Sequence, residues 1–326
     1  MENNTTHKDY ATLLGISQDS VSYNVSLSSK TWIHRGGMAT VWFSPKNREE
    51  LIKIGKYLYS NNLPFDIIGH TSNLYFTNSY NSKFIVDTKK IKEIVWNNTT
   101  IICDCGVAVS SLAKECVSRG IQGFEGLVNL PGTIAGATVN NSSCFNCGIE
   151  KLLLRIEVLI SSGGIITLHK NDLQYTHRNS AFKNKALRGI ILRVYIDSSH
   201  KQDPVILQQI AAKNTIDRLR TQEGATQNLG STFANYTLKK NIRNLFVRIC
   251  NKMTAVCTTD IIKRQHIGKM LFLTLYHCRH LAPYVSDKNI GCYIWKDANA
   301  DRYFETYVHF MHTACKNCEL EIEVKQ

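Results

Sequence analysis

The chain has 326 residues, of which 43% are hydrophobic and 20% are charged. A chain of this length and apolar content can bury large cores, and it predicts about two or three domains. No window approaches the roughly 18 uninterrupted apolar residues of a membrane-spanning helix, and the first residues lack a basic start followed by an apolar run. We therefore expect a globular, cytoplasmic protein without a membrane partner.

The net charge of +13 favours anionic partners. The lysines and arginines are scattered along the chain, however, and no RNA-binding or zinc-finger signature accompanies them. A phosphorylated small molecule, or merely a solvated basic surface, fits this charge as well as nucleic acid does. We predict a protein without a nucleic-acid partner.

Eleven cysteines raise the question of metal sites and disulfides. Cys144 with Cys147, and Cys315 with Cys318, have the spacing of zinc half-sites, so a joint zinc site is one alternative. A cytosolic location disfavours disulfides. We expect free, mostly buried thiols and no bound metal.

The first predicted helix begins with Ser44 as its N-cap and Pro45 at its first position. Its apolar stripe is formed by Leu51, Ile54 and Leu58. Residues 65–68 and 74–76 then predict two short strands, which flank a polar loop at residues 69–73. This part of the chain therefore predicts mixed α and β structure.

A similar unit follows, because residues 92–106 predict a hairpin and residues 107–120 a helix that ends at Gly120. That helix turns three side chains inward: Val109, Leu112 and Cys116. Residues 152–169 predict a hairpin that turns at residues 162–164, and residues 189–197 predict one more strand.

The pattern changes near residue 202, where we place a domain boundary. Residues 205–222 and 258–283 predict helices, and residues 301–315 predict a third helix. The apolar face of that third helix comprises Phe304, Tyr307, Val308 and Met311. The chain then closes with a short predicted strand at residues 320–324.

One segment stands out because it carries no charged side chain from Gly126 to Ile149 and is rich in glycine, threonine, serine and asparagine. Small residues let the backbone approach a ligand closely, and the hydroxyl and amide groups are neutral hydrogen-bond partners. The segment therefore suits a cofactor with phosphates and a polar ring. A glycine-rich surface loop that packs against itself is the alternative.

The polar loop at residues 69–73 lies at a strand end, where backbone amides can also meet a pyrophosphate. Two such loops in one αβ region favour a dinucleotide. Neither has the strand-GxGxxG-helix form, so a Rossmann fold is disfavoured.

Six segments resemble motifs of the UDP-N-acetylenolpyruvoylglucosamine reductase family, and they occur in the family's order. The longest, GFEGLVNLPGTIAGATVNNSSCFNCGIE at residues 123–150, is similar to the family's FAD-contacting segment. The other five are KTWIHRGGMATVWFSPKNREEL, IIGHTSNLYF, LQYTHRNSAFK, NLGSTFAN and LEIEV.

The resemblance implies an α+β fold, namely a two-subdomain FAD-binding fold of the PCMH/vanillyl-alcohol-oxidase type with a C-terminal substrate-binding α+β domain. We place the two FAD-binding subdomains at residues 1–85 and 86–202, and the substrate-binding domain at residues 203–326. The implied cofactor is FAD, with NADPH as the hydride donor. The implied reaction reduces the enolpyruvyl ether of UDP-N-acetylglucosamine to UDP-N-acetylmuramate for peptidoglycan synthesis. The partner is thus a UDP-sugar substrate, and we expect a monomer.

The resemblance also assigns site residues. Arg178 matches the arginine that binds the substrate carboxylate, Ser231 the donor that protonates the intermediate, and Glu323 the carboxyl that meets the developing charge. That last role requires burial or neighbours that keep the carboxyl protonated. Asn235 is a candidate substrate ligand. The positions matched to FAD binding are Gly69, Ser72, Asn73, Pro131, Gly132, Thr133, Gly136, Ala137 and Asn140.

Departures from the family pattern keep two alternatives open. Thr71 stands where the family has glycine, and Ala234 and Tyr236 replace its usual lysine and proline. Residues 280–299 occupy the place of an expected glycine-rich, histidine-containing segment. The alternatives are a flavin reductase of another nucleotide sugar in surface polysaccharide synthesis, and a non-catalytic homologue that binds FAD or a nucleotide sugar.

Overall fold

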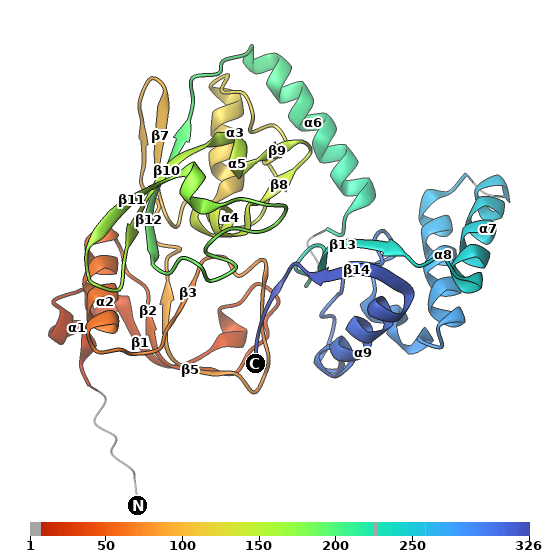
Figure 1. Ribbon diagram of the computed structural model, residues 1–326, viewed down its shortest axis with the longest axis horizontal. Helices are drawn as coiled ribbons and strands as arrows, with labels where there is room; N and C mark the ends of the chain where they lie inside the picture. The colour runs from red at the N-terminus through yellow and green to blue at the C-terminus, as the bar shows by residue number, and fades with distance from the viewer. Residues whose placement is uncertain (1–7, 225–226, 258) are drawn as a thin grey trace, which may run out of the picture. The chain divides into compact units, whose positions relative to one another are not determined.

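The computed structural model of the chain describes residues 8–224, 227–257 and 259–326. The contacts between residues divide the chain into two compact units, whose elements are labelled in Figure 1. Unit 1 comprises Met1–Ser26, Met38–His70 and Asn81–Asn214, and unit 2 comprises Leu27–Gly37, Thr71–Tyr80 and Thr215–Gln326. Both units mix helices and strands, as the sequence predicts. The domain boundaries proposed at residues 85 and 202 stay a prediction.

The described elements are connected mostly by short turns, but residues 119–133, 174–189 and 285–298 contain no helix and no strand of the named set. The α-helices are α1 (Tyr10–Leu14), α2 (Arg48–Ser60), α3 (Val109–Ser118), α4 (Ile134–Asn140), α5 (Ile149–Leu152), α6 (Pro204–Thr221), α7 (Ile242–Cys257), α8 (Ile261–Leu275) and α9 (Asn299–Ala314). The strands are β1 (Val21–Ser26), β2 (Met38–Phe43), β3 (Asp66–Ile68), β4 (Leu74–Phe76), β5 (Asn81–Asp87), β6 (Ile94–Trp96), β7 (Thr100–Asp104), β8 (Ser143–Cys144), β9 (Cys147–Gly148), β10 (Leu153–Leu159), β11 (Ile165–His169), β12 (Ile190–Asp197), β13 (Phe233–Leu238), β14 (Cys315–Leu320) and β15 (Glu323–Lys325).

Unit 1 contains two larger sheets. The first has the order β1-β2-β5-β3, in which β5 runs parallel to both β2 and β3. The second has the order β11-β10-β12-β7-β6 and is antiparallel throughout. The predicted hairpins at residues 92–106 and 152–169 are confirmed by the β6–β7 and β10–β11 pairs.

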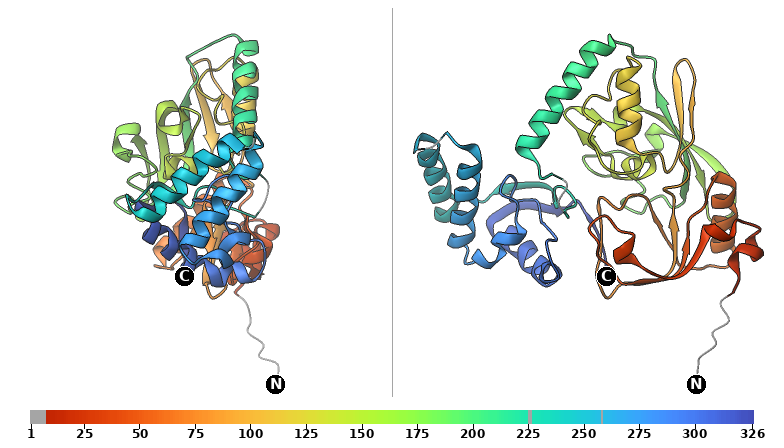
Figure 2. Two further views of the ribbon diagram at one scale, coloured as in Figure 1. Left: turned by 90° about the vertical axis from the view of Figure 1, so that its right-hand side faces the viewer. Right: turned by 180° about the vertical axis from the view of Figure 1, so that it is seen from behind.

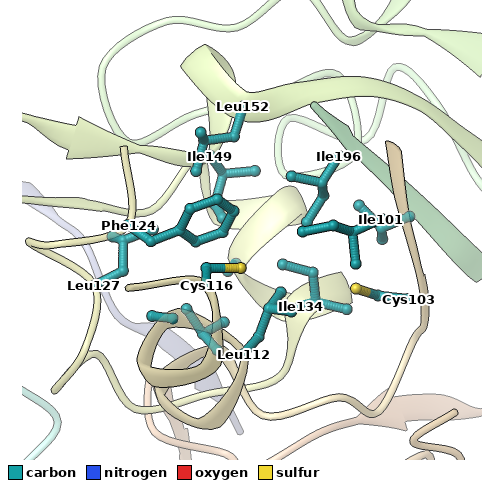
Figure 3. Close-up of a cluster of buried hydrophobic side chains, with 14 of the residues drawn as sticks. Ile101, Cys103, Leu112, Cys116, Phe124, Leu127, Ile134, Ile149, Leu152 and Ile196 are labelled. Atoms are coloured by element: carbon teal, nitrogen blue, oxygen red, sulfur yellow. The ribbon is translucent and has the colours of Figure 1, made fainter. Parts of the chain in front are cut away.

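Strand β12 of the five-stranded sheet contributes side chains to two apolar clusters. On β12, Ile191 and Val194 belong to the cluster that includes α3, α4 and α5, whereas Ile190 and Leu192 pack with the side chains of α2. A register shift between β10 and β12 falls at Leu192, so that Ile191 and Val194, three positions apart, can belong to the same cluster. Figure 2 shows α3 running alongside this sheet. Figure 3 shows the first cluster, in which Cys116 of α3 lies among aliphatic side chains.

The helix predicted to begin at Ser44 begins instead at Arg48, so its predicted N-cap is wrong. Asn47 is the N-cap, and its side chain accepts a hydrogen bond from the Glu50 amide at 2.9 Å. Acidic residues in the first turn favour this start, because they complement the helix dipole. The predicted inner stripe of this helix is confirmed, because its three apolar side chains are buried.

Unit 2 is built around an aromatic core that includes Tyr293, Trp295, Phe304 and Tyr307. Strand β13 pairs antiparallel with β14, and β15 pairs parallel with β4. The long helix predicted at residues 258–283 is interrupted, because α8 ends at Leu275 and His277 has a left-handed backbone. Thr258, at the start of that prediction, lies outside the described residues. Within the described part of the chain, no helix is both long and apolar enough to cross a bilayer.

Candidate functional site

The uncharged segment forms a short helix and its N-cap, not a continuous loop. Thr133 caps α4 by accepting a hydrogen bond from the Gly136 amide at 3.3 Å, and its side chain is buried. The preceding Gly132 has φ +121, a backbone conformation that favours glycine. The Ile134 amide bonds the Val107 carbonyl at 2.8 Å, which fixes α4 to the start of α3.

The two predicted cofactor segments meet within unit 1. A Cβ atom on Gly69 would lie 2.4 Å from the Thr133 Oγ1 atom and 2.8 Å from its Cγ2 atom. No larger residue fits this contact, because both distances are shorter than real Cβ contacts. Gly69 therefore allows the end of β3 to touch the N-cap of α4.

The groups around this contact fit the chemistry of an FAD. The matched residues of the second segment supply hydroxyl, amide and backbone groups and no acidic side chain: Pro131, Gly132, Thr133, Gly136, Ala137 and Asn140. All but Thr133 and Ala137 are half-buried, as expected of a surface that can contact a ligand. Phosphates and a polar ring need such close, neutral hydrogen-bond partners.

The first predicted loop continues from Gly69 in unit 1 to Ser72 and Asn73 in unit 2. His70 is half-buried, and burial, with a further contribution from the Lys89 charge, lowers its pKa. Its ring is therefore neutral near pH 7. Ser72 is also half-buried.

Thr71, at the position where the resemblance expects glycine, adopts a backbone conformation that favours glycine. Its backbone has φ +56, the left-handed region in which a β-branched residue is strained by about 1 to 2 kcal/mol. Its buried Oγ1 atom accepts a hydrogen bond from the Trp32 amide at 2.8 Å. This bond offsets part of the strain at Thr71.

We expect Thr71→Val to destabilise the protein by about 1 to 3 kcal/mol, because valine keeps the strain and leaves the Trp32 amide without its acceptor. Thr71→Gly should change the free energy of unfolding by less than about 1 kcal/mol, because relief of strain opposes loss of the bond. Denaturant titration followed by tryptophan fluorescence measures both. Equal losses in the two variants would show that the left-handed backbone carries no strain at this position.

Arg178 lies at a tight turn that is hydrogen-bonded to α4, again within unit 1. Thr176 and Asn179 exchange two backbone hydrogen bonds, of 3.2 and 3.1 Å, around the turn. Arg178 has φ +55 and is half-buried. The Asn141 side chain, which follows the last residue of α4, donates to the Thr176 carbonyl at 2.9 Å.

Two further bonds tie the same segment to the carboxyl end of α4. The Tyr175 hydroxyl donates to the Thr138 carbonyl at 2.9 Å, and the Ser180 hydroxyl donates to the Val139 carbonyl at 2.6 Å. Both carbonyls lie in the last turn of the helix, where i+4 amide partners are missing, and the Thr138 carbonyl accepts in addition from the Asn141 amide at 3.4 Å. The structure thus joins the predicted carboxylate-binding segment to the predicted cofactor helix.

In unit 2, Ser231 is exposed and follows Gly230, which has φ +76. The Asn289 Nδ2 atom lies 3.4 Å from the Ser231 Oγ atom, in a long hydrogen bond. The Asn289 Oδ1 atom accepts hydrogen bonds from the Tyr236 hydroxyl at 2.8 Å and from the Gly291 amide at 2.9 Å. These two donors fix the orientation of the amide group, so its NH₂ faces Ser231.

The C-terminal segment links the Ser231 motif to Asn73, also within unit 2. The Glu321 amide donates to the Thr232 carbonyl at 2.8 Å, and the Asn73 side chain donates to the Glu321 carbonyl at 3.1 Å. The Glu323 amide donates to the Asn73 carbonyl at 2.9 Å. Three motifs that are distant in sequence therefore meet along residues 321–323.

Two further predicted residues of unit 2 are exposed. The Glu323 side chain is 57% exposed, and its carboxylate lies 2.7 Å from the Lys325 ammonium group, so it lacks the burial expected of an acid. Asn235 is exposed on β13, where the pairing with β14 is irregular. Tyr236, its neighbour, points to the opposite face and bonds Asn289.

The motifs did not reveal Asn141 or Asn289. Asn141 is next to the nominated Asn140, and only its left-handed backbone, φ 46 at the C-cap of α4, distinguishes it. Asn289 lies 58 positions beyond Ser231 in the segment that departs from the family pattern. A hydrogen-bond partner so distant in sequence leaves no local signal.

Residues 39–169 match the family model of an FAD binding domain. The UDP-N-acetylenolpyruvoylglucosamine reductase of Prochlorococcus marinus (strain NATL2A) is 31% identical over 214 residues, which are 65% of this chain and 72% of that protein. The reductase of the same name from Caldanaerobacter subterraneus subsp. tengcongensis is 28% identical over 173 residues, 53% of this chain and 57% of that protein. The matches thus span 57% to 72% of the lengths of these relatives.

The solved structure of UDP-N-acetylenolpyruvylglucosamine reductase from Thermus caldophilus has a similar fold. Its TM-score is 0.65, and the likeness covers 94% of this chain and 99% of that chain. At 16% sequence identity this likeness shows the fold alone. Together with the domain match, it confirms the predicted α+β FAD-binding fold.

Proposed function

Because the chain belongs to the UDP-N-acetylenolpyruvoylglucosamine reductase family, we propose that it reduces the enolpyruvyl ether of UDP-N-acetylglucosamine to UDP-N-acetylmuramate. FAD is the cofactor of this FAD-dependent oxidoreductase, and NADPH is the proposed hydride donor. The product is a precursor of peptidoglycan. A cytoplasmic location and a monomeric state belong to the same proposal.

The reaction adds a hydride to the terminal carbon of the enolpyruvyl group. The electron pair of the double bond moves toward the carboxylate, giving an enediolate-like intermediate, and a proton must then reach the adjacent carbon. FAD, when bound and reduced by NADPH, would supply this hydride. The chain's own side chains must bind the carboxylate, stabilise its added charge and deliver the proton.

Arg178 is proposed to bind the substrate carboxylate. A guanidinium group can bind a carboxylate through two parallel hydrogen bonds, which sets its orientation as well as its affinity. The three bonds from Tyr175, Ser180 and Asn141 hold the segment that carries Arg178. Because the backbone of this turn is held, only the Arg178 side chain has to be ordered on binding.

Ser231 is proposed to protonate the intermediate. A serine hydroxyl is a weak acid, so it can donate only to a strong base such as an enolate. Asn289 is proposed as the positioning residue, because its NH₂ group faces the Ser231 oxygen and can stabilise the alkoxide that remains. Tyr236 holds Asn289 in that orientation, which gives this departure from the family pattern a role.

Glu323 is proposed to meet the developing charge. In the structure its carboxylate is exposed and paired with Lys325. Acting as an acid therefore requires that bound substrate displaces this partner and shields the carboxyl from water. Asn235 is proposed as a ligand of the nucleotide sugar, because its exposed amide offers both donors and an acceptor.

One observation supports the proposal above the others: in each unit, motifs distant in sequence are hydrogen-bonded to one another. In unit 1 the Arg178 segment is bonded to α4, and in unit 2 the segment at residues 321–323 is bonded to Thr232 and Asn73. These pairings bring the motifs that carry the proposed site residues together within each unit, as the proposed reaction requires.

We expect the purified protein to be yellow, to lose its colour when NADPH is added without oxygen, and to regain it when UDP-N-acetylenolpyruvoylglucosamine follows. Visible absorption measures all three stages, and product analysis should give one lactyl ether for each NADPH consumed. A protein bleached by NADPH but not reoxidised by this substrate would favour another nucleotide sugar. A colourless protein that FAD cannot reconstitute would contradict the proposal. It would favour the alternative of a non-catalytic homologue that binds a nucleotide sugar.

A further inference from the structure

Helix α7 carries an apolar face that points away from the rest of unit 2. Six large apolar side chains of this helix are between 48% and 90% exposed: Ile242, Leu245, Phe246, Ile249, Met253 and Val256. At about 100° per residue they fall within one arc of about 100°, uninterrupted by a polar residue. The helix is therefore amphipathic with its apolar face exposed.

The opposite face of α7 holds the helix in the fold. Asn244 and Val247 are buried, and the Asn244 side chain donates to the Ala314 carbonyl at 2.9 Å and to the Lys239 carbonyl at 2.8 Å. On the same side α7 lies against α8 (Figure 1). A Cβ atom on Gly268 of α8 would lie 2.8 Å from the Asn251 side-chain oxygen, so the two helices approach closely there. Because these contacts are all made by the opposite face of α7, the apolar face stays exposed to solvent.

Basic side chains surround this face. Residues 239–264 contain seven lysines and arginines, and Asp260 is the single acidic residue among them. Arg248 and Lys252 are exposed on α7 beside the apolar arc, and Lys263 is exposed at the start of α8. Asp260 itself caps α8 by accepting from the Ile262 and Lys263 amides.

We propose that α7 docks on the surface of an anionic phospholipid bilayer, with its apolar face among the acyl chains and its basic flank against the headgroups. An amphipathic helix with lysine and arginine on its polar side binds in this way, lying in the plane of the interface. A second copy of the chain is a poorer occupant, because two such faces would bring their basic flanks together. The proposal departs from the predicted absence of a membrane partner.

The proposal concerns peripheral attachment and is independent of the proposed reaction. At about 1.5 Å per residue, α7 is about 24 Å long, and it lies along the surface without crossing it. Each lysine or arginine close to an anionic membrane surface contributes about 1 kcal/mol to the free energy of binding.

Co-sedimentation of the full chain with vesicles tests the proposal. Vesicles of phosphatidylcholine and phosphatidylglycerol should bind the protein, vesicles of phosphatidylcholine alone should bind it much less, and added salt should weaken binding. The double variant Leu245→Ser with Ile249→Ser should bind at least about tenfold more weakly, because each buried apolar side chain contributes more than 1 kcal/mol. Arg248→Gln with Lys252→Gln should weaken binding about thirtyfold, from the ~1 kcal/mol per charge.

Helix α6 offers matched controls in the same protein. Ile216 and Leu219 are 51% and 62% exposed, so Ile216→Ser with Leu219→Ser removes the same residue types from another surface. Lys213→Gln with Arg220→Gln removes the same charges. Both control variants should bind vesicles as the wild type does.

A second readout is the emission of a tryptophan placed by Met253→Trp, which should shift to shorter wavelength with the anionic vesicles only. Three results would overturn the proposal. The first is no co-sedimentation, and the second is binding that the Leu245/Ile249 variant retains. The third is a wild-type dimer in sedimentation velocity that this variant converts to a monomer, which would assign the face to a second copy of the chain.

Discussion

Replacing Ser231 with alanine is expected to slow the reduction of the enolpyruvyl substrate by about 10²- to 10³-fold while leaving reduction of the enzyme by NADPH unchanged. The loss corresponds to about 3 to 4 kcal/mol for one well-placed donor to a charged intermediate. The Ser231 hydroxyl is the group that faces Asn289, and alanine removes the proton it would give. Rapid mixing of pre-reduced enzyme with substrate, followed by visible absorption, measures this step alone.

Thr237→Ala is the matched control, because Thr237 is an exposed residue with a hydroxyl group on β13, the strand that follows Ser231. That variant should react at the wild-type rate. Asn289→Ala should slow the same step by a smaller factor, since it leaves the proton in place but removes the group that orients its oxygen. A Ser231→Ala enzyme that turns over normally would exclude Ser231 as the proton donor without excluding the reductase activity.

Replacing Gly69 with alanine is expected to lower the affinity for FAD by about tenfold to a hundredfold. The added methyl group would lie 2.4 Å from the Thr133 Oγ1 atom, and Thr133 is buried and caps α4. Either the end of β3 or the N-cap of α4 must therefore move. Such overpacking costs about 1 to 3 kcal/mol of stability as well. Titration of the apoprotein with FAD and denaturant unfolding measure the two effects.

Gly164→Ala provides the comparison within unit 1. A Cβ atom there makes only ordinary contacts, with Ser162 Oγ at 3.7 Å as the nearest, so both quantities should stay unchanged. Combining Gly69→Ala with Thr133→Ala should restore part of the stability lost by Gly69→Ala, because the second change removes the atoms that clash. Wild-type FAD affinity in Gly69→Ala would mean that the loop at residues 69–73 does not contact the cofactor.

Where local patterns agree with the packing, the sequence predicted the fold well. The strand at residues 74–76 and the helix ended by Gly120 both form as expected, and Gly120 has the left-handed φ of +70 typical of a helix stop. Helix α4 was missed because its sequence, with one glycine and β-branched residues, has low helix propensity. Hydrogen bonds from other elements stabilise it, and these have no local signature.

Helix α7 was missed for a different reason. Its apolar residues do follow a helical period, but this segment of the sequence was considered only for its basic residues. A helical period predicts an apolar face without telling what covers it. For the candidate site, the motifs located the segments that meet in each unit, while Asn289 and the exposure of Glu323 depend on packing between distant segments.

Helix α4 has only seven residues, yet the segments at its two ends have different proposed tasks. Residues 131–133 of the cofactor segment and Gly69 lie at its N-terminal end, and the segment that carries Arg178 is bonded to the carbonyls of its last turn. A displacement of so short a helix at one end reaches the other end within two turns. Cofactor and carboxylate binding should then share a coupling free energy, and by thermodynamic reciprocity each ligand would change the affinity for the other by the same factor.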